Sequence, residues 1–262
     1  QKYLVNVGNF TGSNKDSKEN SVSDKPLTKI EKDRIIVLFI SFLIVIVFWG
    51  AYEQAGGLMN IYASEKTNRI LPFSLPLIGN ESPASWVQAL VALFIIILGT
   101  SVAGYWAKRK LQGKLSTSLF KMLIGLVFMG TGYFFMSAAA GQNLSTGSSA
   151  MYWLVLTYLF HTIGELCVSP VALSYITKLA PVKYASLMMG IYFAMTGIGN
   201  KIAGLIGESA SELGEFMVFT GIAIISIIFG LTVMLFRKKL EVLTHGAEDD
   251  EHEMSNDELL EN

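Results

Sequence analysis

Three ionisable side chains fall inside stretches of sequence that are otherwise apolar. They are Glu53, Glu165 and Lys201. By insertion scales, a charge at the centre of a membrane-spanning helix costs about 2.5–3.5 kcal/mol, so such residues normally face a cavity or pair with another group. Three of them in six apolar stretches predict a polar pathway across a membrane.

Glu165 belongs to a stripe of polar residues near the middle of its apolar stretch. Members of the stripe recur at three- and four-residue spacing, on one face of a helix: Tyr158, Thr162 or His161, Glu165 and Ser169. Pro170 should kink the helix beside this stripe. His161 and Glu165 have the i, i+4 spacing of metal ligands, but no third ligand candidate is near, so His161 is predicted to be a hydrogen-bonding packing residue.

Glu53 and Lys201 lie beside other polar and small residues. Glu53 follows Trp49 by one helical turn, so the two share a face, and the glycine pair 56–57 loosens the helix just beyond. Lys201 is expected at a similar depth, and we hypothesise that it pairs with Glu53. The alternatives are that either side chain reaches the outer interface, and that Glu165 makes only a structural hydrogen bond.

The stretch around Lys201 has two further patterns at helical spacing. One is a second polar stripe, formed by Tyr192, Thr196 and Asn200. The other is a row of small residues, formed by Gly199, Ala203 and Gly207, which predicts close approach of a neighbouring helix.

Composition indicates a membrane protein. The chain has 262 residues, of which 52% are hydrophobic and 16% charged, against about a quarter charged in soluble domains. Residues 35–236 hold only 17 of the 41 charged residues. The net charge of −1 argues against a nucleic-acid partner, and a single cysteine, Cys167, excludes an intramolecular disulfide.

The apolar runs are continuous and do not alternate, which favours helices over barrel strands. We predict an all-α membrane protein with six transmembrane helices at 35–57, 84–107, 118–140, 151–175, 185–210 and 215–236. Lysine and arginine gather at one end of these helices, so both termini are expected in the cytoplasm. Residues 1–34 are predicted to be a cytoplasmic linker, 35–240 the bundle and 241–262 a disordered acidic tail. The chain begins at Gln1, which suggests a fragment.

Two segments resemble a known family. FWGAYEQAGG, from Phe48 to Gly57, resembles the seventh-helix motif of the proton-coupled oligopeptide transporters. The segment from His161 to Asn200, with its Gly-Glu-Leu and Ser-Pro core, resembles that family's tenth and eleventh helices. The resemblance runs from about residue 25 to 240. It implies the C-terminal six-helix half of a twelve-helix major facilitator fold.

The resemblance also implies roles for residues. Glu165 would contact the peptide ammonium, and Trp49, Ser169 and Tyr192 would line the cavity. Tyr158 is added to this substrate site because it belongs to the polar stripe. Glu53 would serve in proton coupling and in an outer gate, through an arginine of the absent N-terminal half, and Lys201 is assigned to gating as its hypothetical partner.

The expected function is therefore proton-coupled symport of di- and tripeptides by alternating access, in a bacterial cytoplasmic membrane. The partners would be short peptides, protons, the lipid bilayer and an N-terminal six-helix half, with protons as coupling ion and no other cofactor or metal. One departure is the eighth-helix segment 88–92, Gln-Ala-Leu-Val-Ala, where the family usually has Gln-x-x-Asn-Pro. The alternative is a major facilitator transporter of another small solute. An enzyme is disfavoured because no nucleophile–base pair or metal-ligand set is apparent, and a purely structural subunit would not require Glu165 and Tyr192 to face one cavity.

Overall fold

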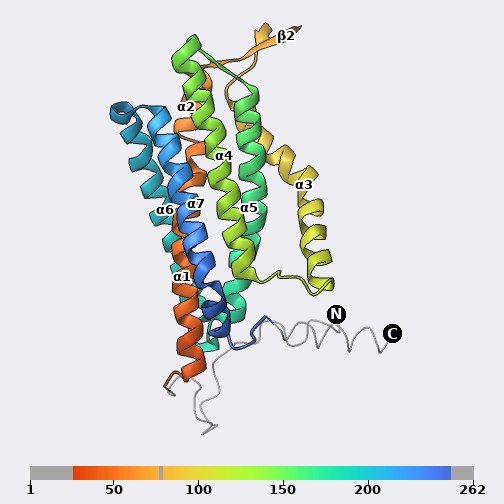
Figure 1. The fold of residues 1–262 in the computed structure, drawn as a ribbon, viewed down its shortest axis with the longest axis vertical. Helices are drawn as coiled ribbons and strands as arrows, with labels where there is room; N and C mark the ends of the chain where they lie inside the picture. Colours follow the sequence, from red (N-terminus) through yellow and green to blue (C-terminus); the bar gives the residue numbers. More distant parts are fainter. Residues whose placement is uncertain (1–25, 77–78, 249–262) are drawn as a thin grey trace, which may run out of the picture.

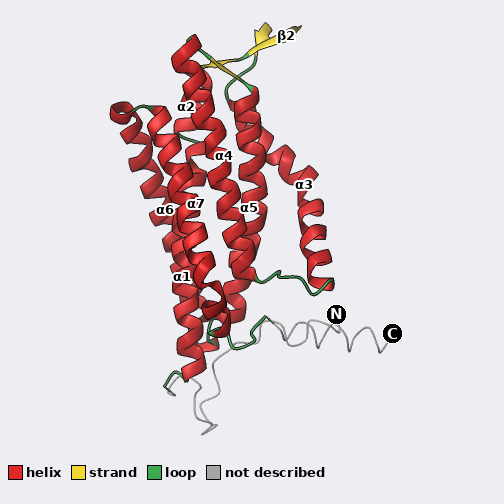
Figure 2. Ribbon diagram, viewed as in Figure 1, coloured by secondary structure: helices red, strands yellow, loops and turns green. Residues whose placement is uncertain are grey.

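The computed structural model describes residues 26–76 and 79–248. Long helices make up most of this part of the chain (Figures 1 and 2). The helices are α1 (Lys29–Tyr52), α2 (Leu58–Glu65), α3 (Ser85–Leu111), α4 (Ser118–Thr146), α5 (Tyr152–Leu179), α6 (Ala185–Leu213) and α7 (Glu215–Val242), with 3₁₀ turns η3 (Glu53–Ala55) and η4 (Val182–Tyr184).

Five helices are long and apolar enough to cross a membrane, within the described residues: α1 continued by α2, α3, α4, α5 and α7. The sequence prediction counted six. The difference is α6, which matches the predicted fifth span in position and has 29 residues, but is less apolar. Asn200 and Lys201 in its interior and several glycines lower its hydropathy. By their length and composition, these five helices indicate an integral membrane protein.

The first helix begins earlier than predicted, at Lys29 instead of residue 35. Thr28 and Glu31 form a capping box: the Thr28 side chain accepts from the Glu31 amide at 3.2 Å, and the Glu31 carboxylate accepts from the Thr28 amide at 2.8 Å. Most of the predicted linker, residues 1–25, and of the predicted acidic tail, residues 249–262, lies outside the described residues.

Helix α4 is the centre of the bundle and packs between α5 and α7, while α1 packs along α6 (Figure 1). Glycines set these close contacts. A Cβ atom on Gly125 of α4 would lie 2.7 Å from the carbonyl oxygen of Gly164 of α5, and a Cβ on Gly164 would lie 2.7 Å from that of Gly125. The two backbones therefore touch directly beside Glu165.

Helix α3 stands apart from the rest of the bundle. Only 6% of its most apolar 18-residue window is buried, and its main packing partner is α5 (Figure 1). Apolar side chains on the remaining surface suit a lipid-facing or partner-facing helix.

Within the described ranges, four short strands lie at one end of the bundle, and the sequence prediction did not include them. β2 (Ile70–Leu75) and β3 (Gly79–Glu81) form an antiparallel pair, and β1 (Thr67–Asn68) pairs in parallel with β4 (Ser149–Ala150). The other end holds the start of α1, the end of α3, the start of α4 and the ends of α5 and α7 (Figure 1). Its lysine and arginine residues form what we call the basic end, with Lys32, Arg34, Lys108, Arg109, Lys110, Lys121, Lys178 and Arg237.

Candidate functional site

The helix that carries Glu53 is broken at that residue. The α-helix ends at Tyr52, residues 53–55 form a 3₁₀ turn, and Gly57 has φ −106° and ψ −108° before α2 begins. The prediction that the glycine pair loosens this helix is confirmed. Broken helices inside a membrane need neighbouring groups to satisfy the backbone, and they commonly line transport sites.

Two buried tyrosines bind backbone carbonyls at this break. The Tyr133 hydroxyl of α4 donates to the Ala51 carbonyl at 2.6 Å, and the Tyr158 hydroxyl of α5 donates to the Ala55 carbonyl at 3.2 Å. Tyr158 was predicted to line the substrate site, but its side chain is only 1% exposed. Its hydroxyl donates to the backbone at the break, so in this structure Tyr158 holds the broken helix, and its role in the substrate site stays a prediction.

Glu165 lies near the middle of α5 and is half-buried. Its carboxyl group accepts a hydrogen bond of 2.5 Å from the Tyr52 hydroxyl at the end of α1. Gly164 faces α4, and the next residue, Glu165, points to another side of α5, where it contacts α1. The Glu165 carboxyl group therefore lies between α5 and α1, and a different hydrogen-bond donor could take the place of the Tyr52 hydroxyl.

An aromatic cluster surrounds this contact. The Tyr52 ring packs edge-on against Trp49, with centroids 5.3 Å apart, and stacks on Phe48 at 5.6 Å. Tyr192 of α6 is 4% exposed and its hydroxyl lies near the indole of Trp49, although the indole N–H has no hydrogen bond of normal geometry within the described residues. Trp49, Tyr192 and Glu165 are thus gathered where α1, α5 and α6 approach each other.

Glu53 is half-buried and its charge interacts with that of Glu165. It lines a hollow of about 280 Å³ between the break and α3, together with Tyr52, Gly56 and Gln88. The carboxyl groups of Glu53 and Glu165 are close enough for their charges to repel, so ionisation of one disfavours ionisation of the other.

The hypothetical pair between Glu53 and Lys201 does not form. Among the residues that the structure describes, no ion pair joins them, and Lys201 is exposed on α6. The row of small residues explains this orientation. Gly199 lies against α1, where an added Cβ would be 2.9 Å from the Cβ of Trp49, and Lys201 is two residues, or about 200°, further round the helix.

Two other predicted polar residues have mixed outcomes. Ser169 is half-buried as a residue, but its hydroxyl oxygen is buried. This hydroxyl has no hydrogen-bond partner within the described part of the chain. His161 is 1% exposed and packs its ring 4.6 Å from that of Tyr133, which confirms the packing part of its predicted role but not the hydrogen-bonding part. Neither ring nitrogen has a protein partner of normal geometry in the described residues.

The sequence analysis assigned no role to Tyr52 or Gln54, although both stand in the quoted motif around Glu53. Gln54 is 1% exposed and its amide donates to the Ala203 carbonyl of α6 at 2.7 Å. Both residues could have been recognised by their polar groups next to Glu53, since a polar side chain inside an apolar helix needs a partner.

A bundle of apolar helices in which one helix is broken at Glu53, with the carboxyl group of Glu165 nearby, resembles the solute sites of membrane transporters. The family model described as PTR2, POT family, matches residues 13–227. The chain belongs to the POT family.

Relatives in sequence include the peptide transporter YePEPT of Yersinia enterocolitica, which is 36% identical over 69% of this chain and 35% of the relative. A di-/tripeptide transporter of Lactococcus lactis is 30% identical over 83% of this chain and 43% of the relative. The chain therefore spans less than half the length of these relatives.

Solved structures agree. A mutant of a peptide transporter POT in complex with alafosfalin matches with a TM-score of 0.73 and 27% identity, over 82% of this chain and 43% of that one. A POT family transporter in complex with a thioalcohol-conjugated peptide matches with a TM-score of 0.73 and 25% identity, again over 82% and 43%.

Proposed function

We propose that this chain is the C-terminal half of a proton-coupled importer of di- and tripeptides, with the other half supplied by residues outside the chain. In this proposal α6 is the sixth membrane-spanning helix, and the basic end, with both termini, lies in the bacterial cytoplasm. The relatives named as peptide transporters support the substrate class. The observation that carries the proposal is the Glu165 carboxyl group, held by Tyr52 beside the broken helix.

Glu165 binds the ammonium group at the peptide N-terminus. A carboxylate in a site of low polarity offers the countercharge and accepts charge-assisted hydrogen bonds. The Tyr52 hydroxyl fills one acceptor position of the carboxylate at 2.5 Å, and the peptide ammonium replaces or joins this donor. Trp49 and Tyr192 supply the aromatic wall beside the peptide.

Glu53 takes up the coupling proton. Because its charge interacts with that of Glu165, an ionised Glu53 opposes the ionised Glu165 that the ammonium requires. A proton on Glu53 removes this repulsion, so proton binding and peptide binding favour each other, as linkage requires. Movement to the inward-facing state returns Glu53 to an environment where it releases the proton.

The test uses the complete protein as the cell makes it, reconstituted in proteoliposomes. Glu53→Gln is expected to abolish accumulation driven by a proton gradient and to leave counterflow exchange of a dipeptide. Glu165→Gln is expected to weaken dipeptides with a free N-terminus at least tenfold more than N-acetylated ones. Glu212→Gln, a change at an exposed acid near the end of α6, is the matched control.

Two results would contradict the assignment. Gradient-driven accumulation that persists in Glu53→Gln would remove Glu53 from proton coupling. Equal weakening of free and N-acetylated peptides in Glu165→Gln would show that Glu165 does not meet the ammonium. Uptake that dipeptides fail to inhibit in the unaltered protein would instead favour the alternative, a major facilitator transporter of another solute.

A further inference from the structure

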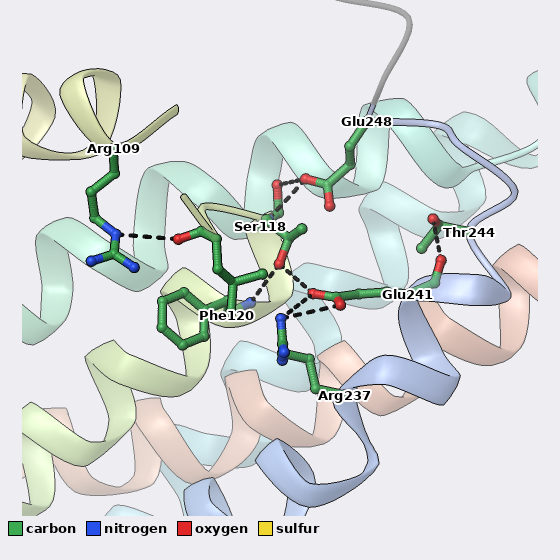
Figure 3. A network of polar contacts seen from close by, with 9 residues as sticks. Arg109, Ser118, Phe120, Arg237, Glu241, Thr244 and Glu248 are labelled. Atoms are coloured by element: carbon green, nitrogen blue, oxygen red, sulfur yellow. Dashed lines mark hydrogen bonds and ion pairs between the residues drawn. The ribbon is translucent and has the colours of Figure 1, made fainter. Parts of the chain in front are cut away.

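A second polar network lies at the basic end, where α4 begins and α7 ends (Figure 3). Thr117 caps α4 by accepting from the Phe120 amide at 3.4 Å, and its hydroxyl donates to Glu241 of α7 at 2.5 Å. Arg237 donates to the same carboxylate at 3.1 and 3.2 Å. These contacts fix the start of α4 against the end of α7 without using any residue of the proposed peptide site.

The carboxylate of Glu248, six residues after the end of α7, binds the first turn of α4 (Figure 3). It accepts from the Ser118 amide at 2.8 Å and also from the Ser118 hydroxyl. The first amides of a helix have no intrahelical acceptor, and the helix dipole makes this end positive, so an anion is stabilised there.

The surroundings of this carboxylate are basic. A cavity of about 380 Å³ beside it is lined by four lysines from three helices and the connection between them: Lys110, Lys114, Lys121 and Lys178. The charge of Glu248 interacts with that of Lys121. A lysine-lined cavity next to a helix N-terminus, with a carboxylate already in place, has the chemistry of an oxyanion site.

The segment that delivers Glu248 is itself anchored. Arg34 of α1 donates to the Thr244 carbonyl at 2.9 Å and to the His245 carbonyl at 3.4 Å. The His245 ring lies 2.8 Å from the Asp33 carboxylate, and its backbone has φ +50°, a conformation that is uncommon for residues other than glycine. Residues 243–248 therefore join the ends of α1, α4 and α7.

We propose that the lysine-lined cavity at the start of α4 is an oxyanion-binding site, and that its resident ligand is the carboxylate of Glu248. Bound there, Glu248 holds residues 243–248, which follow α7, against the start of α4; we call this contact the Glu248 clasp. When the carboxylate is removed, the site takes a free oxyanion of similar charge, with inorganic phosphate as the probe. This site is separate from Glu53 and Glu165, and the proposal does not depend on peptide transport.

The test is residue-resolved amide hydrogen exchange on the complete protein in lipid nanodiscs. Glu248→Ala is expected to speed exchange of the Ser118 amide roughly fivefold, because that amide loses its acceptor. The Phe120 amide keeps Thr117 as its acceptor and serves as an internal reference. Millimolar phosphate should restore protection of Ser118 in the variant, whereas sodium chloride at matched ionic strength should not.

The matched control is Glu212→Ala, which removes one exposed carboxylate near the C-terminal end of α6, away from the basic end. It should leave the exchange rate of the Ser118 amide unchanged. Lys121→Met combined with Glu248→Ala should abolish the rescue by phosphate. Unchanged Ser118 exchange in Glu248→Ala would overturn the clasp. Faster exchange that phosphate does not reverse, or that chloride reverses equally, would overturn the oxyanion site.

Discussion

Tyr133→Phe tests whether the broken helix is held by its tyrosine partners. The substitution removes one hydroxyl and keeps the ring, so the packing of Tyr133 against Phe219 and His161 is retained. What is lost is the hydrogen bond of 2.6 Å to the Ala51 carbonyl at the end of α1. The break itself, and with it the position of Glu53, should become less stable.

The magnitude follows from the surroundings of the bond. Interhelical hydrogen bonds in membrane proteins contribute about 0.6 kcal/mol on average and about 1.7 kcal/mol at most. The Tyr133 side chain is 0% exposed, so water cannot replace the lost donor, and its bond is short. We therefore expect the upper part of this range, about 1.5 kcal/mol. Tyr158→Phe should lose less, because its bond to the Ala55 carbonyl is longer, at 3.2 Å.

The assay is reversible unfolding in sodium dodecyl sulfate, followed by tryptophan fluorescence. Tyr152→Phe is the matched control, since it removes the same hydroxyl from a ring that is 53% exposed. The free energy of unfolding should fall most for Tyr133→Phe, less for Tyr158→Phe and least for Tyr152→Phe. If Tyr133→Phe were as neutral as the control, the tyrosines would not stabilise the break and the reasoning would fail.

Other contacts between helices give further predictions. Gly164→Ala should destabilise the fold, because its Cβ would lie 2.7 Å from the Gly125 carbonyl, whereas Gly190→Ala, with no neighbour within 4 Å, should be neutral; thermal unfolding compares them. Gln54→Met should lower the free energy of unfolding by about 1 kcal/mol, because the Ala203 carbonyl loses a donor at 2.7 Å. Equal melting temperatures of the two glycine variants, or an unchanged Gln54→Met protein, would contradict these contacts.

The apolar runs were sufficient to predict the long helices, because a membrane leaves the backbone few other choices. The helix boundaries depended on local chemistry that the hydropathy pattern does not contain. The capping box of Thr28 and Glu31 extends α1 by about two turns into polar sequence. The strand pair β2–β3 lies in the connection between α2 and α3, where the mostly apolar strand β2 has six residues and is too short to predict a membrane span.

For the site, the residue types were predicted better than their orientations. Depth along the helix suggested that Glu53 and Lys201 meet, but depth says nothing about direction around the helix axis. Gly199 and Ala203 both face α1, and Lys201 lies halfway between them, about 200° from each. The row of small residues therefore already contained the evidence that Lys201 points away from Glu53.

Three consecutive residues at the break contact three different neighbouring helices. Tyr52 donates to Glu165 of α5, Glu53 lines the hollow beside α3, and Gln54 donates to the Ala203 carbonyl of α6. Successive side chains in helical and 3₁₀ backbone point about 100–120° apart, so a single turn can reach all three helices. A shift of this one turn would change the contact to each neighbour at once. If Glu53 takes up the proton as proposed, a change of its charge would act on the turn that contacts all three helices.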